Sequence, residues 1–303
     1  MPDKLMIIAG PTATGKSDLA VRLAKAYEGE IISADSVQVY KGMDIGSAKI
    51  TKTQMEGVSH HLIDILTPDM DYSVADFCRM AKEKIGEITK RGHLPIVVGG
   101  TGFYIRALLY DTDFVKGEGD ERIRAALNDF LEAKGPDALY ERLLDIDPEY
   151  GATVHKNNIK RVMRAIEYYE LSGEKFSSYN ERESRRESPY DFRYYVLTAP
   201  RELLYERINQ RVDKMMDMGL LEEVRGLKEQ GYGRRLKSMQ SIGYKEIYDY
   251  LEGDVDIERA VYNIKLETRH FAKRQLTWFK RDGDAEWIDI CEADPYEYIS
   301  AGS

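Results

Sequence analysis

The chain has 303 residues, of which 43% are hydrophobic and 32% charged, and its formal net charge at pH 7 is −9. This size suits one large α/β domain or a core domain with an insertion. The composition is that of a soluble globular protein. Its negative charge argues against general coating of nucleic acid, although a local basic surface remains compatible with it.

Only two cysteines occur, Cys78 and Cys291, and their spacing matches no metal-binding motif. A disulfide framework is therefore not expected, and we expect the protein to be in the reducing cytoplasm. No signal peptide is visible, and no segment approaches the length of a membrane span, so no membrane partner is expected.

The first seventeen residues carry the strongest motif. Residues 5–9 are a short apolar run typical of a buried strand, and residues 18–27 carry apolar side chains at helical spacing. Between them, the sequence matches G-x-x-x-x-G-K-[ST] at Gly10, Pro11, Thr12, Ala13, Thr14, Gly15, Lys16 and Ser17. This order predicts a phosphate-binding loop, in which backbone N–H groups and a helix N-terminus surround phosphate oxygens. Lys16 would add a point charge, and the Ser17 hydroxyl is a candidate ligand for Mg²⁺.

Further strands and helices alternate along the next hundred residues. Apolar runs predict strands at 30–35, 61–66 and 94–100, and helices are predicted from the N-cap Ser73 to about 91 and from 101 to about 110. Alternation of this kind predicts an α/β fold, a parallel sheet with helices on both faces. Ligands of such sheets bind beyond the carboxyl ends of the strands, where Asp35 and Thr101 would join the phosphate-binding loop.

The pattern changes near residue 113. Residues 116–120 are polar and contain glycine, which suggests a linker, and only helical patterns follow from 121 to about 173. The charged segment 177–188 is expected to be a loop, and strand character returns at 193–198. We therefore predict a core domain of residues 1–115 and 191–303, interrupted by an all-helical insertion at 116–190. Beyond residue 200 the chain is mostly helical, with a long basic helix within 254–281 and a last strand at 285–290.

Two features at the predicted strand ends could carry chemistry. Asp35 could bind Mg²⁺, act as a general base, or only cap a loop or helix. The turn at 99–102, Gly-Gly-Thr-Gly, could form an active-site wall or simply let a helix pack closely.

Basic residues on two predicted helices are equally open to interpretation. Arg207 and Arg211 share one helix face and could clamp a diphosphate, or form an ordinary solvated face. The C-terminal basic helix contains Phe271 and Trp278, which suits contact with a nucleic-acid backbone and unstacked bases. The same aromatic residues could instead belong to the core side of an amphipathic helix.

Six segments in chain order resemble the bacterial tRNA dimethylallyltransferase (tRNA isopentenyltransferase) family. They are residues 10–17, 33–40, 41–49, 98–104, 239–246 and 268–278. The most specific are Asp-Ser-x-Gln-x-Tyr at 35–40 and Lys-Arg-Gln-x-Thr-Trp at 273–278. Eukaryotic relatives often add a C-terminal zinc finger, for which this chain has no Cys/His spacing, so it is similar to the short bacterial form.

The resemblance implies an enzyme that transfers a dimethylallyl group from dimethylallyl diphosphate to N6 of the adenine 3′ of the anticodon in tRNA. The phosphate-binding loop, a type that often binds ATP, would here hold the diphosphate, with Mg²⁺ as the cofactor at Ser17. Asp35 would be the general base, Thr101 would lie near the adenine, and Lys16 and Arg211, with Arg207 nearby, would bind the diphosphate. The adenine would have to leave its stack.

The resemblance also implies partners. The anticodon stem-loop of tRNA and dimethylallyl diphosphate would bind to a monomer. The implied tRNA-binding residues are Asp35, Ser36, Val37, Gln38, Thr101, Arg124, Lys160, Arg161, Arg164, Gln240, Gly243, Lys245, Arg269, Lys273, Arg274 and Gln275. Two other functions share the phosphate-binding loop: a small-molecule or nucleotide kinase, and a non-enzymatic switch that binds RNA and nucleotide.

Overall fold

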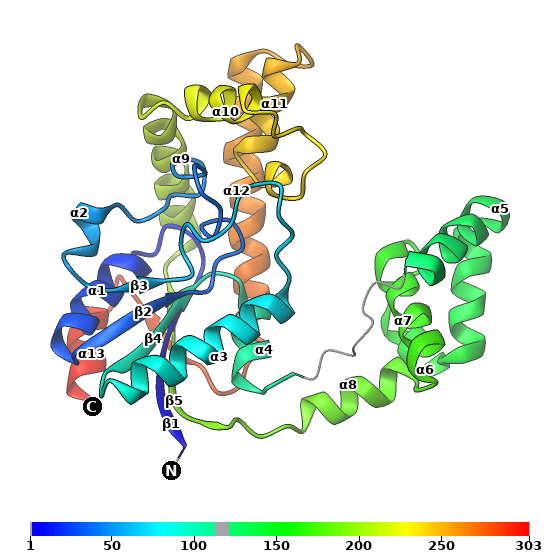
Figure 1. The fold of residues 1–303 in the computed structure, drawn as a ribbon, viewed down its shortest axis with the longest axis horizontal. Helices are drawn as coiled ribbons and strands as arrows, with labels where there is room; N and C mark the ends of the chain where they lie inside the picture. The colour runs from blue at the N-terminus through cyan, green and yellow to red at the C-terminus, as the bar shows by residue number, and fades with distance from the viewer. Residues whose placement is uncertain (1, 113–120, 303) are drawn as a thin grey trace. The chain divides into compact units, whose positions relative to one another are not determined.

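The structure, a computed structural model, describes residues 2–112 and 121–302 (Figure 1). The linker predicted at 116–120 lies outside the described residues. Contacts between Cα atoms divide the chain into two compact units, Met1–Leu109 with Pro189–Ser303, and Tyr110–Ser188. The boundaries expected from the sequence are 116 and 190, and those drawn by the contacts are 110 and 188.

The first unit is built on a parallel sheet, which confirms the predicted fold class. Its strands are β1 (Asp3–Ala9), β2 (Gly29–Ser33), β3 (His60–His61), β4 (Leu94–Gly99), β5 (Tyr190–Thr198) and β6 (Glu286–Asp289). Their order across the sheet is β3-β2-β4-β1-β5-β6, and every pair is parallel. In the central register, Ile8 of β1 lies opposite Val98 of β4 and Tyr195 of β5.

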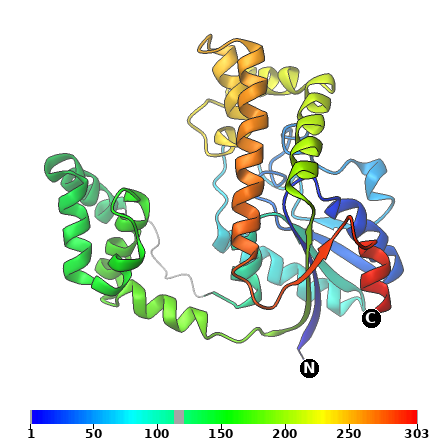
Figure 2. The ribbon, with the colours of Figure 1, turned by 180° about the vertical axis from the view of Figure 1, so that it is seen from behind.

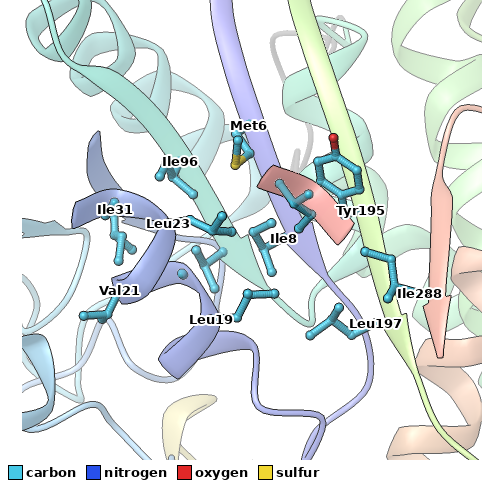
Figure 3. Close-up of a cluster of buried hydrophobic side chains, with 14 of the residues drawn as sticks. Met6, Ile8, Leu19, Val21, Leu23, Ile31, Ile96, Tyr195, Leu197 and Ile288 are labelled. Atoms are coloured by element: carbon cyan, nitrogen blue, oxygen red, sulfur yellow. The ribbon is translucent and has the colours of Figure 1, made fainter. Parts of the chain in front are cut away.

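One face of this sheet is covered by α1 (Lys16–Ala26) and α13 (Pro295–Ala301) (Figure 2). Side chains alternate between the two faces of a strand, so Met6 and Ile8 of β1 point to the same side. There they pack with Leu23 of α1, Ile96 of β4 and Leu197 of β5, as Figure 3 shows. This apolar layer fixes the start of α1 against the carboxyl ends of the strands.

The other face carries α3 (Val74–Lys90) and α4 (Gly102–Leu109). The Ser73 hydroxyl accepts a hydrogen bond from the Asp76 backbone N–H, and the Asp76 carboxylate accepts one from Ser73, so the predicted N-cap of α3 is confirmed as a capping box. Phe77 of α3 stacks on Tyr104 of α4, with ring centroids 4.8 Å apart.

A further helical layer stands beyond the carboxyl ends of the strands. It comprises α9 (Arg201–Asp217), α10 (Leu220–Glu229), a 3₁₀ turn (Ser238–Gln240), α11 (Tyr244–Leu251) and α12 (Ile257–Phe279). The short helix α2 (Lys52–Met55) lies apart from this layer, where Met55 packs against the apolar cluster of α1. Figures 1 and 2 show α9 and α12 running side by side. A second apolar cluster joins Tyr40 and Met43, from the chain after β2, to Leu220, Tyr244 and Ile264 of this layer.

The second unit is helical. It contains α5 (Glu121–Ile146), α6 (Pro148–Thr153), α7 (Ile159–Ser172) and α8 (Phe176–Ser184). Gly135 adopts φ 80° and ψ 173°, and Pro136 follows it, so α5 is two helices joined by a kink. Leu139 and Leu143 of α5 pack against Ile166 of α7 in a core of this unit's own.

Two local predictions are wrong. The strand expected at 61–66 ends at His61, because Leu62 and Asp64 adopt φ values of 61° and 55°, which no strand permits. The loop expected at 177–188 begins as α8, because Phe176 and Tyr179 bury their rings against Tyr168 of α7. Two buried aromatic rings thus stabilise a helix whose other residues are mostly charged or polar.

Candidate active site

A cavity of about 510 Å³ opens at the carboxyl ends of β1, β2 and β4. The phosphate-binding loop, the chain after β2, the turn after β4, α9 and α12 all contribute to its walls. The residues expected from the sequence that line it are Thr12, Ala13, Gly15, Lys16, Ser17, Asp35, Ser36, Val37, Gln38, Thr101, Arg211, Gln240, Gly243, Arg274 and Gln275. The cavity therefore unites segments that lie up to 263 residues apart.

The phosphate-binding loop needs its two glycines. Gly10 has φ 140° and lies so close to β5 that a Cβ atom there would approach Leu197 O to 2.5 Å. Gly15 has φ 83° and is the N-cap of α1, where it leaves the first helical N–H groups without a side-chain cap. Thr14 donates to Pro11 O at 2.9 Å and closes the loop from inside. The loop thus presents a helix N-terminus to the cavity.

Lys16 is poised to respond to an anion. Its ammonium donates to Pro11 O at 2.6 Å. Burial and the nearby positive charge of Arg211 lower the pKa of Lys16 to about 7, while the negative charge of Asp35 raises it. An anion in the loop would favour the charged form of this side chain.

Arg211 reaches the same loop from α9. One of its Nη atoms donates to Thr12 Oγ1 at 3.3 Å, and burial lowers the pKa of its guanidinium. Arg207, one turn earlier on α9, is exposed and does not line the cavity. The two arginines therefore differ in place, and Arg211 is the one that meets the phosphate-binding loop.

Asp35 follows the end of β2 by two residues. Its Oδ1 accepts hydrogen bonds from the backbone N–H groups of Val37, at 2.8 Å, and Gln38, at 3.2 Å. This turn orients the carboxylate at the cavity wall without using Oδ2. Asp35 therefore caps a turn, one of the three roles left open by the sequence, and it lines the same cavity as Lys16.

The Gly-Gly-Thr-Gly turn after β4 packs closely against its neighbours and also lines the cavity. A Cβ atom at Gly99 would collide with Ala34 O, one at Gly100 with the Gln275 amide, and one at Gly102 with the Trp278 ring. Close packing therefore requires these glycines. The turn is a cavity wall as well, because Thr101 lines it.

The basic helix α12 is divided between core and cavity. Phe271 and Arg274 line the cavity, and the Arg274 guanidinium lies 5.9 Å from the centroid of the Phe271 ring. Trp278 packs edge-on against Phe103 of α4, and Phe279 is fully buried. Phe271 and Trp278 thus serve different purposes that their sequence pattern does not separate.

The other residues implied as tRNA contacts lie outside the cavity wall. Lys245 and Lys273 are exposed, and Arg269 donates to Asn209 Oδ1 at 3.3 Å. In the second unit, Arg124 pairs with Glu167 at 3.1 Å, and α7 carries the exposed side chains Lys160, Arg161 and Arg164.

Some residues that shape the cavity had no sequence signal. Glu223 of α10 holds the chain segment that leads into Ser47 and Ala48, two residues of the cavity wall. That segment belongs to the family-like motif at 41–49, to which the sequence assigned no role. Glu223 itself lies in an ordinary amphipathic helix pattern.

The chemistry of the site fits a cation held mainly by a ligand. Over residues 2–112 and 121–302, no group of three or more His, Cys, Asp or Glu residues forms a metal site. Mg²⁺ commonly uses one or two protein oxygens and completes its shell with water and substrate phosphates. The exposed Ser17 hydroxyl and the Asp35 carboxylate, both at the cavity, supply such oxygens.

Within the described part of the chain, no helix is long and apolar enough to span a bilayer.

Comparisons with known proteins agree over the whole length of the chain. A family model described as IPP transferase matches residues 38–282, and one described as isopentenyl transferase matches residues 3–67. A tRNA dimethylallyltransferase of Lachnoclostridium phytofermentans is 54% identical over 284 residues, covering 94% of this chain and 91% of that protein.

Solved structures extend the similarity to the fold. The crystal structure of a full-length tRNA isopentenylpyrophosphate transferase from Bacillus halodurans matches with a TM-score of 0.74 and 45% identity, over 99% of this chain and 94% of that chain. A eukaryotic dimethylallyltransferase, solved in crystallographic snapshots as acting on tRNA, matches with a TM-score of 0.81 and 29% identity, over 99% of this chain and 77% of that chain.

Proposed function

Because this chain belongs to the IPP transferase family, we propose that it transfers a dimethylallyl group from dimethylallyl diphosphate to N6 of the adenine 3′ of the anticodon in tRNA. The products are N6-isopentenyladenosine in tRNA and free diphosphate. The observation that carries this proposal is that Lys16, Asp35 and Arg211 line one cavity of about 510 Å³. An anion-binding end and a proton acceptor thus share one space. We infer from the tRNA substrate that the enzyme works in the cytoplasm.

The reaction exchanges one bond at the donor for another. The N6 lone pair forms a bond to C1 of the dimethylallyl group, while the bond from C1 to the diphosphate oxygen breaks and its electron pair leaves with the diphosphate. The proton lost by N6 passes to the Asp35 carboxylate. An exocyclic amine is a weak nucleophile, so both a proton acceptor and a stabilised leaving group are needed.

The leaving group lies at the phosphate-binding loop in this proposal. The Lys16 ammonium turns from Pro11 O, its acceptor at 2.6 Å, to the diphosphate. The Arg211 guanidinium, 3.3 Å from Thr12 Oγ1, closes the other side. Mg²⁺, when bound, supplies further positive charge to the diphosphate oxygens, with Ser17 as its protein ligand. Positive charge is thus concentrated where negative charge grows as the C–O bond breaks.

The adenine approaches from the side of Asp35 and Thr101. Because protein residues line the cavity, the adenine must leave its stack in the tRNA loop to enter it. The hydrogen bonds from Val37 and Gln38 to Asp35 Oδ1 hold the carboxylate in place, so that Oδ2 can accept the proton. Thr101 offers a hydroxyl beside the base.

Contacts to the RNA backbone come from exposed cations. Lys273 and Arg274 on α12 are exposed beside the cavity-lining ring of Phe271, an arrangement that suits phosphates and an unstacked base. In the second unit, we propose Lys160 and Arg161 on α7 as phosphate contacts. These assignments, and those of the remaining residues that the resemblance implies, are part of the proposal.

One assay separates the proposed transferase from the two alternatives. Purified protein is incubated with unmodified tRNA, labelled dimethylallyl diphosphate and Mg²⁺, and the label is then measured in RNA. A transferase labels the RNA, a kinase consumes ATP with a small acceptor instead, and a binding switch retains tRNA without labelling it. An RNA without the target adenine is the control for position.

Asp35→Asn tests the role of the carboxylate in the same assay. A general base predicts that transfer falls by about 10²- to 10⁴-fold with little change in diphosphate affinity. A Mg²⁺ ligand predicts weaker Mg²⁺-dependent binding of diphosphate and partial recovery at higher Mg²⁺. A turn cap alone predicts nearly unchanged activity, since Asn caps almost as well. We expect the first outcome.

A further inference from the structure

Gln275 of α12 is a buried polar side chain with two partners far away in the sequence. It is only 6% exposed. Its Oε1 accepts a hydrogen bond from the Thr12 backbone N–H at 3.0 Å, and its Nε2 donates one to Gly100 O at 2.9 Å. The side-chain amide thus joins the phosphate-binding loop after β1 to the Gly-Gly-Thr-Gly turn after β4.

The surroundings of this amide leave it little freedom. A Cβ atom at Gly100 would collide with the Gln275 Nε2 atom, so the turn must carry glycine for the amide to fit. On the opposite side, Thr12 accepts a hydrogen bond from Arg211 through its hydroxyl while its N–H is held by Gln275. The same short segment is therefore fixed by two helices, α9 and α12.

We propose that Gln275 is a positioning residue that sets the spacing between the phosphate-binding loop and the turn carrying Thr101. This inference rests on the proposed function, in which the loop holds the diphosphate and the turn adjoins the adenine. The two reactants must meet with their atoms in line, and a displacement of about 1 Å can cost about 100-fold in rate. A buried amide with one donor and one acceptor in use fixes both position and orientation.

This role differs from direct contact with tRNA, which the resemblance implies for Gln275. Its neighbours Lys273 and Arg274 are exposed, whereas both polar atoms of the Gln275 amide are engaged inside the protein. A positioning role predicts a loss in the chemical step with tRNA affinity retained. A contact with RNA predicts the reverse.

Gln275→Met separates these two roles, because methionine has a similar length and neither hydrogen bond. We expect kcat for dimethylallyl transfer to fall about 10- to 100-fold. Because no RNA contact is lost in this role, we also expect KM for tRNA and the salt dependence of tRNA binding to stay within about twofold of the unchanged protein. Gln230→Met is the matched control, because Gln230 is exposed and its amide donates to Gly226 O at the C-terminal end of α10. We expect it to leave kcat unchanged.

Gln275→Glu adds a readout that a packing role would not produce. The carboxylate can accept from Thr12 N–H but opposes Gly100 O, whereas a protonated carboxyl can donate to it. Its activity relative to the unchanged protein should therefore rise as pH falls. Gly100→Ala disturbs the same contact from the other side, and its effect on kcat should be less than additive with that of Gln275→Met.

Thermal unfolding of each variant is measured first, and the Gly100→Ala and Gln275→Glu variants decide the matter if Gln275→Met does not fold. Unchanged kcat with a raised KM for tRNA would overturn the inference, as would full additivity in the double variant. Failure of the unaltered protein to label tRNA would instead overturn the proposed function. The two failures are therefore distinguishable within one set of assays.

Discussion

The Tyr244 hydroxyl donates a hydrogen bond of 2.7 Å to Oε1 of Glu223, and the same carboxylate accepts from three consecutive backbone N–H groups. Those of Asp44 and Ile45 bond to Oε2 at 3.0 and 2.7 Å, and that of Gly46 bonds to Oε1 at 3.1 Å. Burial and the neighbouring Glu223 raise the pKa of Tyr244, so its hydroxyl stays protonated as a donor. One carboxylate on α10 therefore anchors the chain that continues into the cavity wall.

The first prediction concerns this anchor. Glu223→Gln replaces one acceptor oxygen by an NH₂ group, which cannot accept from the backbone N–H groups it would face. We expect the free energy of unfolding to fall by about 1 kcal/mol, because hydrogen bonds of a half-buried carboxylate are lost. Urea denaturation measures this loss directly.

Glu222→Gln is the control for that experiment, since it makes the same chemical change one residue earlier. The Glu222 side chain is 66% exposed and pairs only loosely with Arg225, at 3.7 Å. We expect a change below about 0.5 kcal/mol for this variant. Equal losses in the two variants would show that Glu223 is no anchor.

The parts of the site that the sequence predicts are those whose physical cause is local. The phosphate-binding loop, the N-cap at Ser73 and the strand leading to Asp35 each follow from residues within a few positions of one another. The hydrogen bonds of Glu223 join residues 177 to 179 positions apart, and no pattern near Glu223 in the sequence predicts them. Long-range partners of this kind emerge only from the fold.

Charge patterns were misleading for a related reason. Residues 177–188 contain many charged side chains, yet α8 forms because Phe176 and Tyr179 find aromatic partners on another helix. The decisive partner, Tyr168 of α7, lies outside the local segment.

The second prediction concerns Lys16 and pH. Because its pKa is lowered to about 7 in the protein without ligand, Lys16 is mostly neutral at pH 8.5, and the ammonium that binds diphosphate must first gain a proton. We expect diphosphate binding at pH 8.5 to take up close to one proton per site, measured by calorimetry in two buffers of different ionisation heat. Affinity should fall as pH rises from 7 to 9.

Lys16→Ala completes that test. It should abolish the proton uptake and reduce transfer by about 100-fold or more, as expected for loss of one preorganised charge. Affinity independent of pH between 7 and 9 in the unaltered protein would contradict the lowered pKa. Transfer at the unaltered rate by a folded Lys16→Ala protein would remove the loop from the mechanism.

The third prediction concerns the cations of α12. Contacts to phosphates release counterions, so the affinity for tRNA should fall steeply with salt even though the net charge is −9. Replacing Lys273 and Arg274 by Gln should reduce the slope of log K against log salt by about 1 to 2. Binding of dimethylallyl diphosphate should change little. Filter binding of tRNA at several salt concentrations measures the slope.

The matched control for α12 replaces Lys52 and Lys90 by Gln, because both are exposed cations and the total charge changes equally. We expect the salt slope of this control to match that of the unaltered protein. If both double variants lower the slope alike, the effect belongs to the overall charge and α12 is no RNA surface.

The last prediction concerns stability in acid, at the end of the sheet opposite the cavity. Glu30 of β2 is 6% exposed. Its carboxylate contacts Arg91 at 2.8 Å, His61 Nε2 at 2.7 Å and His93 Nδ1 at 2.8 Å. Burial alone would raise the pKa of Glu30, but hydrogen bonds from these three residues outweigh it and lower the pKa to about 2.

A carboxylate whose pKa is lowered by folding stabilises the protein above its unfolded pKa of 4.5, and this contribution is lost as pH falls toward about 2. Glu30→Gln should therefore cost about 1 to 3 kcal/mol at pH 7. The difference from the unaltered protein should narrow as pH falls from 4.5 toward 2, because Glu30 of the unfolded chain then binds a proton that it must give up on folding. Glu28→Gln, at an exposed position two residues earlier, should show neither effect. Urea denaturation from pH 7 to pH 2.5 measures both quantities, and a difference that stays constant over this range would refute the assignment.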